Sequence, residues 1–356
     1  MLADSQNEVA VVVNLRARRG SEAIARRCEA LLPGARVLAS RSMDDTMSFA
    51  RRLHESPVDL VVAAGGDGTA AALLNAFRRA TPDGRKVALL PTGSERAALG
   101  VVPLGTGNGW ARATGAPRWR KAIRRLGEFL QANRPIPIWR FDLLDIEDFV
   151  APFAGTGWDA EIIDDFHAQK SGWGLLPHKA RTGLFGYLHG VATRTIPRHM
   201  RMAAPEVELV NTGDDAFTVD DDGRMVKLLG GEHGKVLYRG PFSVCAAGTT
   251  PEWGFGFRAF PFAGLVPRRF CMRIYKGKAL EAAFRAPQLW VGQHPMRNMH
   301  TWMLTSCRAS FSRPVPFQVA GDRIGMRDTV EYKLAREQVN MLDWSHLRAG
   351  SLDDAA

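Results

Sequence analysis

The chain has 356 residues, enough for two domains, and its 47 Lys and Arg against 37 Asp and Glu give a net charge of +10. This charge favours an anionic partner: a nucleotide, an acidic membrane or a nucleic acid. Four scattered cysteines without a CxxC pair argue against a zinc site or a disulfide framework and indicate a reducing cytoplasm. No apolar stretch approaches the roughly 20 residues of a spanning helix, so we expect a cytoplasmic protein that at most rests on a membrane.

The first part of the chain alternates short apolar strands with amphipathic helices. Strands are expected at 9–13, 36–39 and 58–63, and helices at 21–32, 44–53, 69–79 and 117–131. Strands and helices that alternate at short intervals form parallel sheets covered by helices. We therefore predict an α/β, doubly wound nucleotide-binding domain over residues 1–135.

A glycine loop, Gly65-Gly66-Asp67-Gly68-Thr69, joins the third strand to the next helix. Such a loop lets the backbone approach a phosphate, which the N–H groups at the helix start then face. It lacks the Lys-Ser/Thr of a P-loop and the spacing of a dinucleotide fingerprint. Asp67 has three alternative roles here: it holds Mg²⁺, positions a nucleophile or braces the loop.

A second glycine-rich turn spans residues 103–109 and contains Gly105, Thr106 and Asn108. Parallel strands of one sheet end at the same edge, where ligands bind. We therefore expect the two loops to meet there and to clasp one triphosphate.

The pattern changes near residue 136. Short alternating runs between Gly, Pro and Asp turns predict a mainly antiparallel β-sandwich domain over residues 136–350. One basic, helical stretch interrupts them, and no acidic residue lies between Asp165 and Glu206. Its aromatic and basic residues predict that residues 170–202 dock on an anionic membrane surface; a solvated helix with core aromatics is the alternative.

The two loops, together with an early strand that ends in Asn14, resemble the diacylglycerol kinase and sphingosine kinase family, and bacterial lipid kinases in particular. The resemblance implies an NAD kinase/diacylglycerol kinase-like fold, ATP and Mg²⁺ as cofactors, and Asp67 as a catalytic and metal-binding residue. It also implies that ATP contacts the following positions of this sequence: Asn14, Ser40, Gly65, Gly66, Gly68, Thr69, Gly105, Thr106 and Asn108.

Three positions depart from the family pattern. Ala320 stands where bacterial members have the aspartate proposed as general base, Gly109 replaces an aspartate after the second loop, and residues 261–265 lack another. Asp67 is then the remaining candidate base, as in sphingosine kinases, and Asp322 is a second one. Asp159 either binds the substrate headgroup, where sphingosine kinases use an acid, or caps a helix.

The resemblance implies an ATP-dependent lipid kinase that phosphorylates diacylglycerol, a sphingoid base or a ceramide-like lipid. Two alternatives are NAD kinase, whose superfamily shares the first loop, and a non-catalytic nucleotide- or lipid-binding protein. No nucleic-acid-binding module is recognisable in the sequence. The sequence leaves open whether the protein forms a homodimer.

Overall fold

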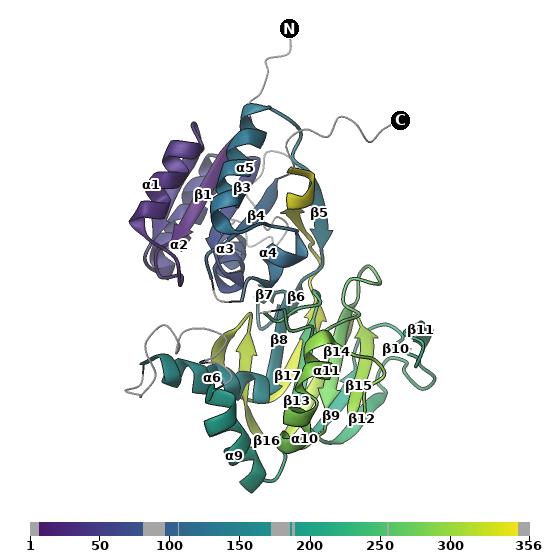
Figure 1. Ribbon diagram of the computed structural model, residues 1–356. Coiled ribbons are helices and arrows are strands. Elements are labelled where there is room, and N and C mark those ends of the chain that lie inside the picture. The colour runs from purple at the N-terminus through teal and green to yellow at the C-terminus, as the bar shows by residue number, and fades with distance from the viewer. Residues whose placement is uncertain are drawn as a thin grey trace. The chain divides into compact units, whose positions relative to one another are not determined.

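The computed structural model describes residues 7–80, 97–105, 107–171, 186, 189–254 and 256–347. The chain divides into two compact units. Unit 1 comprises Met1–Phe141 and Glu337–Ala356, and unit 2 comprises Asp142–Arg336. The N-terminal α/β and C-terminal antiparallel classes are both confirmed (Figure 1).

Unit 1 is built on a sheet with the strand order β2-β1-β3-β4-β18-β5. Neighbouring strands are parallel except β5, which is antiparallel to β18, so the sheet is mixed. The strands are β1 (Val9–Asn14), β2 (Arg36–Ser40), β3 (Leu60–Gly65), β4 (Ala98–Pro103), β5 (Ile138–Phe141) and β18 (Val339–Leu342).

Two helices of unit 1, Glu22–Leu31 and Met43–Glu55, begin at side-chain caps. Ser21 accepts a hydrogen bond from Ile24 N, and Ser42 forms a capping box with Asp45. The helices are α1 (Glu22–Leu31), α2 (Met43–Glu55), α3 (Asp67–Ala80), α4 (Gly109–Ala113), α5 (Trp119–Gln131) and the 3-10 helix η2 (Trp344–Leu347).

Helices α1 and α5 share one hydrophobic core on the sheet. That core contains Ile24 and Cys28 of α1 and Ile123 and Leu126 of α5, together with alternate residues of β1 and β3. Gly127 lets the two helices approach closely, because a Cβ at this position would lie 2.4 Å from the carbonyl oxygen of Leu31. The packing of α1 against α5 therefore depends on a residue without a side chain.

Unit 2 is a twelve-stranded antiparallel sheet. The long strand β16 joins its two parts, because it pairs with β9 through residues 307–311 and with β8 through residues 317–319. The strands are β6 (Leu144–Ile146), β7 (Phe149–Ala151), β8 (Phe153–Gly157), β9 (Glu206–Asn211), β10 (Phe217–Val219), β11 (Met225–Lys227), β12 (Val236–Pro241), β13 (Val244–Gly248), β14 (Phe270–Tyr275), β15 (Met299–Leu304), β16 (Ser306–Val319) and β17 (Asp322–Leu334).

The described helices of unit 2 are short apart from the first. They are α6 (Trp158–Ser171), the π-helix η1 (Val191–Thr195), α9 (Ile196–Arg201), α10 (Ala279–Phe284) and α11 (Ala286–Val291). No helix within the described residues of either unit combines the length and the hydropathy needed to cross a bilayer.

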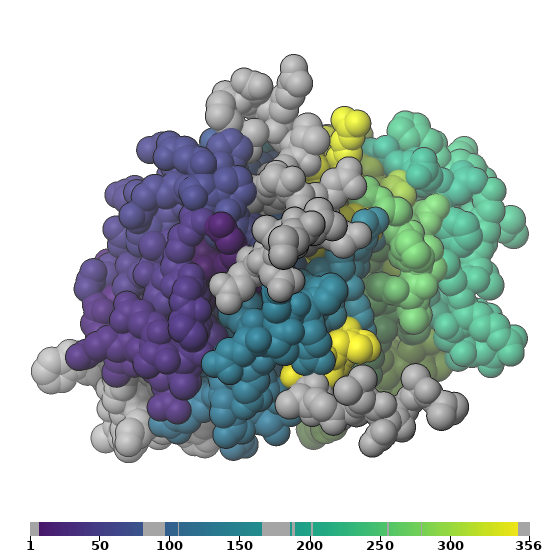
Figure 2. Space-filling model, turned by 90° about the horizontal axis from the view of Figure 1, so that it is seen from above, coloured from purple at the N-terminus to yellow at the C-terminus, as the bar shows by residue number. Residues whose placement is uncertain are grey.

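The C-terminal segment differs from the sequence prediction, which assigned all of residues 136–350 to the second domain. Residues from Glu337 onward return to unit 1, where β18 lies between β4 and β5. Trp344 N donates to Thr114 O, and the Trp344 ring is fully buried. In Figure 2 the yellow C-terminal residues lie against the teal surface, in agreement with the packing of η2 on α5. Strand pairing over such a sequence separation leaves no local pattern, so the sequence could not place this segment.

The close contact between α1 and α5 is testable with Gly127→Ala. The added methyl group must push Leu31 away, and overpacking of this kind costs about 1–3 kcal/mol. Urea denaturation should show this loss of unfolding free energy. The control is Gln131→Ala at an exposed position of the same helix. Equal stability of the two variants would contradict the close approach.

Candidate functional site

The two glycine loops are in direct backbone contact. Gly65 O accepts hydrogen bonds from Leu104 N at 2.8 Å and Gly105 N at 3.0 Å. A Cβ on Gly105 would lie 2.4 Å from Gly66 Cα, so no other residue fits without separating the loops. The expectation that the loops meet at one edge of the sheet is therefore met, because β3 and β4 are parallel neighbours that end together.

Asn14 and Thr69 connect the first loop to the end of β1. Asn14 Nδ2 donates to Thr69 Oγ1 at 2.9 Å, while its Oδ1 accepts from Arg16 N at 2.9 Å. Gly65 is also required here, since a Cβ on it would lie 2.3 Å from the Thr69 hydroxyl oxygen. Gly68 and Thr69 lie in the first turn of α3, which begins at Asp67 instead of at Thr69 as predicted.

The remaining predicted nucleotide contacts have local partners. Asn108 adopts a left-handed conformation, with φ of 56°, and its side chain bonds to both the N–H and the carbonyl of Gly105. The buried Ser40 hydroxyl contacts Ser42 O and the Thr46 hydroxyl. Thr106 lies outside the described residues. The nucleotide-binding roles of these residues stay predictions.

Asp67 braces the two loops. Its Oδ2 accepts from Gly109 N at 2.7 Å and its Oδ1 from Trp110 N at 2.9 Å, and its exposed fraction is 7%. The carboxylate thus satisfies the first N–H groups of α4, which otherwise has no side-chain cap. Of the three roles considered from sequence, this geometry matches bracing.

The described residues do not build a metal centre around Asp67. Both of its oxygens accept backbone hydrogen bonds, and no three His, Cys, Asp or Glu side chains gather into a metal-binding group in the described ranges. Mg²⁺ that is bound together with a nucleotide is usually held by one or two carboxylates and the phosphates, and Asp67 is a carboxylate at these loops. The catalytic and metal-binding roles of Asp67 stay predictions.

Asp159, in the first turn of α6, is the unusual carboxylate of unit 2. It is 6% exposed, its Oδ2 accepts from Gln318 Nε2 at 2.9 Å, and its Oδ1 has no hydrogen-bond partner among the described residues. Gly155 makes room for it, since a Cβ there would lie 2.2 Å from Oδ2. Burial raises the pKa of Asp159 to about 7, and hydrogen bonds from Gln318 and from the backbone N–H groups of Ala160 and Asp159 oppose this rise in part.

Gln318 connects Asp159 to the turn between β16 and β17. Its Oε1 accepts from Gly321 N at 2.9 Å. Ala320, where the family has its aspartate, lies in this turn with φ of 52°, and exposed Asp322 begins β17 directly after it. The sequence analysis missed the role of Gln318. The only signal in the sequence was the position of Gln318 two residues before Ala320, where the family pattern has its aspartate.

The basic stretch is partly paired with acids. Arg198 bonds to Glu161 at 3.1 Å and to Asp165 at 2.9 Å, and His199 contacts Glu161 at 2.7 Å. These contacts pair Arg198, one of the basic residues on which the membrane prediction rests, with two acids. Residues 172–185, 187 and 188 lie outside the described residues, so docking through residues 170–202 stays a prediction.

The bracing role of Asp67 predicts a structural cost for Asp67→Asn. An amide keeps one acceptor, so either Gly109 N or Trp110 N must face a donor, which costs about 1–3 kcal/mol. Chemical denaturation without nucleotide should show this loss. Asp221→Asn, at an exposed turn, should change stability by less than about 0.5 kcal/mol. Equal stability of the two variants would contradict the bracing role of Asp67.

The raised pKa of Asp159 predicts a pH-dependent effect of Asp159→Asn. The neutral carboxyl group stabilises the fold below pH 4, and this contribution is lost as the pH rises through about 7. The variant does not titrate at this position. Its free energy of unfolding should therefore rise relative to that of the wild type by up to about 1.4 kcal/mol per pH unit between pH 4 and 7, and should rise no further above pH 7. Thermal unfolding across pH 4–8 measures this gain. A difference that is constant with pH would refute the buried, titrating carboxyl group.

The segment that carries both loops matches a known family profile, and the fold of the chain matches solved structures. The sequence profile of the diacylglycerol kinase catalytic domain matches residues 8–137. A solved structure of a diacylglycerol kinase from Bacillus anthracis aligns with a TM-score of 0.57 at 15% identity, covering 94% of this chain and 96% of that one. A proposed diacylglycerol kinase from the same organism aligns with a TM-score of 0.61 at 16% identity, covering 96% and 99%.

These structural likenesses extend over both units and, at such low identity, show a common fold. No curated protein matches the sequence. The profile match covers both glycine loops, the brace at Asp67 and the end of β1. Residues 8–137 of this chain are therefore similar to the diacylglycerol kinase catalytic domain, and the rest of the chain shares the fold of the two solved structures.

Proposed function

We propose that this protein is an ATP-dependent lipid kinase that transfers the γ-phosphate to a lipid hydroxyl. The observation that carries the proposal is the backbone contact between Gly66 and Gly105 at the carboxyl ends of β3 and β4. The glycines let the two loops lie against each other at this edge of the sheet, beside the first turn of α3, whose N–H groups can face a polyphosphate.

The rigidity of the loops supports nucleotide binding. Asn14 fixes Thr69, and Asp67 fixes the second loop, so the phosphate-facing backbone needs little ordering when the nucleotide arrives. The first turn of α3 adds its positive helix end to the same place. Phosphoryl transfer requires mainly such positioning and charge stabilisation, with little covalent chemistry from the protein.

Asp159 is our candidate for recognition of the lipid. Its unpartnered Oδ1 can accept a hydrogen bond from a hydroxyl or an ammonium group of the headgroup. With a pKa of about 7, Asp159 changes protonation state near physiological pH, as a group that takes up a substrate proton must. Diacylglycerol, sphingoid bases and ceramide-like lipids all carry such a hydroxyl group.

Ala320 supports a second candidate, a nucleotide-binding protein without turnover. The turn between β16 and β17 carries a methyl group where related kinases place an aspartate, and the carboxylate of Asp67 is engaged in bracing. Such a protein would bind ATP through the same loops and leave lipids unmodified.

The decisive experiment follows labelled phosphate from Mg-ATP into mixed micelles of the three lipid classes and into NAD. Labelled lipid supports our proposal, and labelled NAD would reassign the protein as an NAD kinase. Calorimetric ATP binding without any product would establish the second candidate. Absence of ATP binding would overturn both.

Gly105→Ala separates loop function from general stability. Its methyl group must push the loops apart, so we expect at least a tenfold loss of ATP affinity, measured by calorimetry, and a matching loss of phosphate transfer. The control is Gly34→Ala: its φ of 84° strains an alanine, but a Cβ there meets no atom within 4 Å, so this variant should lose stability and keep its ATP affinity. Unchanged ATP affinity in the Gly105 variant would exclude the loop contact as the nucleotide site.

A further inference from the structure

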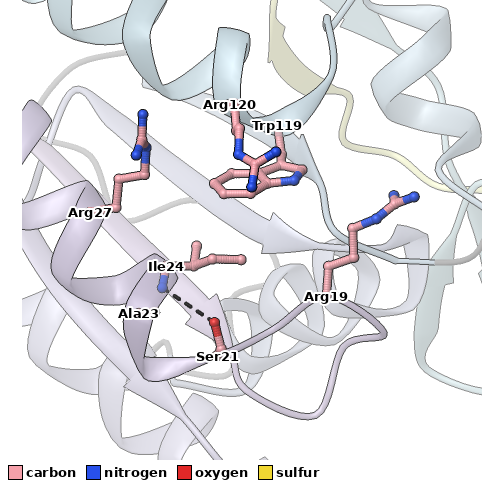
Figure 3. Close-up of a pocket in the computed structure, with 7 residues that line it drawn as sticks. All are labelled: Arg19, Ser21, Ala23, Ile24, Arg27, Trp119 and Arg120. Carbon is pink, nitrogen blue, oxygen red and sulfur yellow. Dashed lines mark hydrogen bonds between the residues drawn. The ribbon is translucent and has the colours of Figure 1, made fainter.

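A second candidate site lies within unit 1, in a pocket of about 570 Å³ between α1 and α5. Figure 3 shows Arg27 and Arg19 on either side of Ile24, with Trp119 and Arg120 across from them. Arg19 comes from the loop after β1, Arg27 from α1, and the other two side chains from the start of α5. The pocket therefore combines three guanidinium groups with an indole ring.

The positive charge of this pocket is not neutralised within the described part of the chain. Neither Arg19 nor Arg27 pairs with an acidic side chain there, and Arg120 stacks on Trp119 with its guanidinium carbon 4.8 Å from the ring centroid. Glu22, the acidic residue in the first turn of α1, pairs instead with Arg41. Nothing described in the pocket competes with an incoming anion.

The N-terminus of α5 adds to this charge, whereas that of α1 is capped by Ser21 and carries Glu22 in its first turn. Ser21, Ala23 and Ile24, which line the pocket, mark the start of α1, and Trp119 and Arg120 are the first residues of α5. The N-terminus of a helix carries a partial positive charge and unsatisfied N–H groups. Proteins usually place acidic residues there, but α5 has no acidic residue in its first turn and no side-chain cap. The positive end of α5 and the arginines of the pocket therefore repel each other unless an anion lies between the helix end and the arginines.

We propose that this pocket binds the phosphate group of a phosphomonoester. A dianionic phosphate matches three guanidinium groups and the uncapped N-terminus of α5 better than a singly charged phosphodiester or carboxylate does. The Trp119 ring provides a flat apolar wall for the organic part of the ligand. The phosphomonoester is either a free metabolite or the headgroup of a phosphorylated lipid.

The pocket is separate from the nucleotide loops but connected to them. The core that α1 and α5 share contains no residue of α3, which carries the first loop. Arg19 N, however, donates to Leu104 O, directly before Gly105 in the second loop. Occupation of the pocket can therefore affect the second loop through one backbone hydrogen bond.

The test compares the wild type with Arg27→Gln and Arg120→Gln. Calorimetry at constant ionic strength with inorganic phosphate and glycerol 3-phosphate measures the free ligands. Flotation with phosphatidylcholine vesicles that contain phosphatidic acid measures the lipid, and phosphatidylserine at equal surface charge is the lipid control. Arg26→Gln is the matched protein control, an exposed arginine next to Arg27 on α1 that does not line the pocket.

We expect each pocket variant to weaken phosphomonoester binding about tenfold, as the loss of one charge-assisted hydrogen bond does, and the Arg26 variant to bind normally. Arg120→Gln should also raise the melting temperature without anion, because the repulsion at the start of α5 is relieved. Binding of glycerol 3-phosphate identifies a free ligand, and binding of phosphatidic acid alone identifies a lipid headgroup. Either result supports the site.

Three results would overturn the proposal. The Arg26 variant could lose as much affinity as the Arg27 variant, which would indicate general charge attraction. Phosphatidylserine vesicles could bind as well as those with phosphatidic acid, while both soluble phosphates fail to bind. ATP could displace glycerol 3-phosphate, with Gly105→Ala abolishing both, which would make the pocket part of the nucleotide site.

Discussion

The backbone contact between Gly66 and Gly105 is the constraint on which the candidate nucleotide site depends. It exists because β3 and β4 are parallel neighbours and because neither loop carries a Cβ at the point of contact. Asn14 and Asp67 then hold the loops from opposite sides, one through Thr69 and the other through the start of α4. A polyphosphate would meet described loop residues that hydrogen bonds already hold, and the cost of ordering loops is a main loss in binding.

Two buried aspartates illustrate how environment sets the role of a carboxylate. Asp67 accepts two backbone hydrogen bonds and acts as a fixed brace. Asp159 has one side-chain partner and one unpartnered oxygen, and burial raises its pKa to about 7. A satisfied carboxylate supports structure, whereas one that lacks a partner favours a ligand that supplies it.

The pocket between α1 and α5 follows from the same electrostatic reasoning. Gly127 lets the two helices approach closely, and Arg27 of α1 and Arg120 at the start of α5 line one pocket between them. Like charges at helix ends reduce stability, and a protein retains them most readily where an anion binds. Our two proposals thus place two anion-binding surfaces on unit 1, one made of backbone at the glycine loops and one made of arginine side chains.

The sequence by itself determined the alternation of strands and helices in unit 1, the antiparallel class of unit 2 and the meeting of the two loops. Each follows from local periodicity or from the rule that parallel strands end at one edge. Only the tertiary structure decided that Asp67 caps Gly109 and Trp110, that Gln318 orients Asp159, that Arg198 is paired with Glu161 and Asp165, and that β18 returns to the first sheet. Except for the pairs of Arg198, these contacts join residues more than forty positions apart, and in each case the partner is chosen by packing in three dimensions. Local sequence patterns carry no information about that choice.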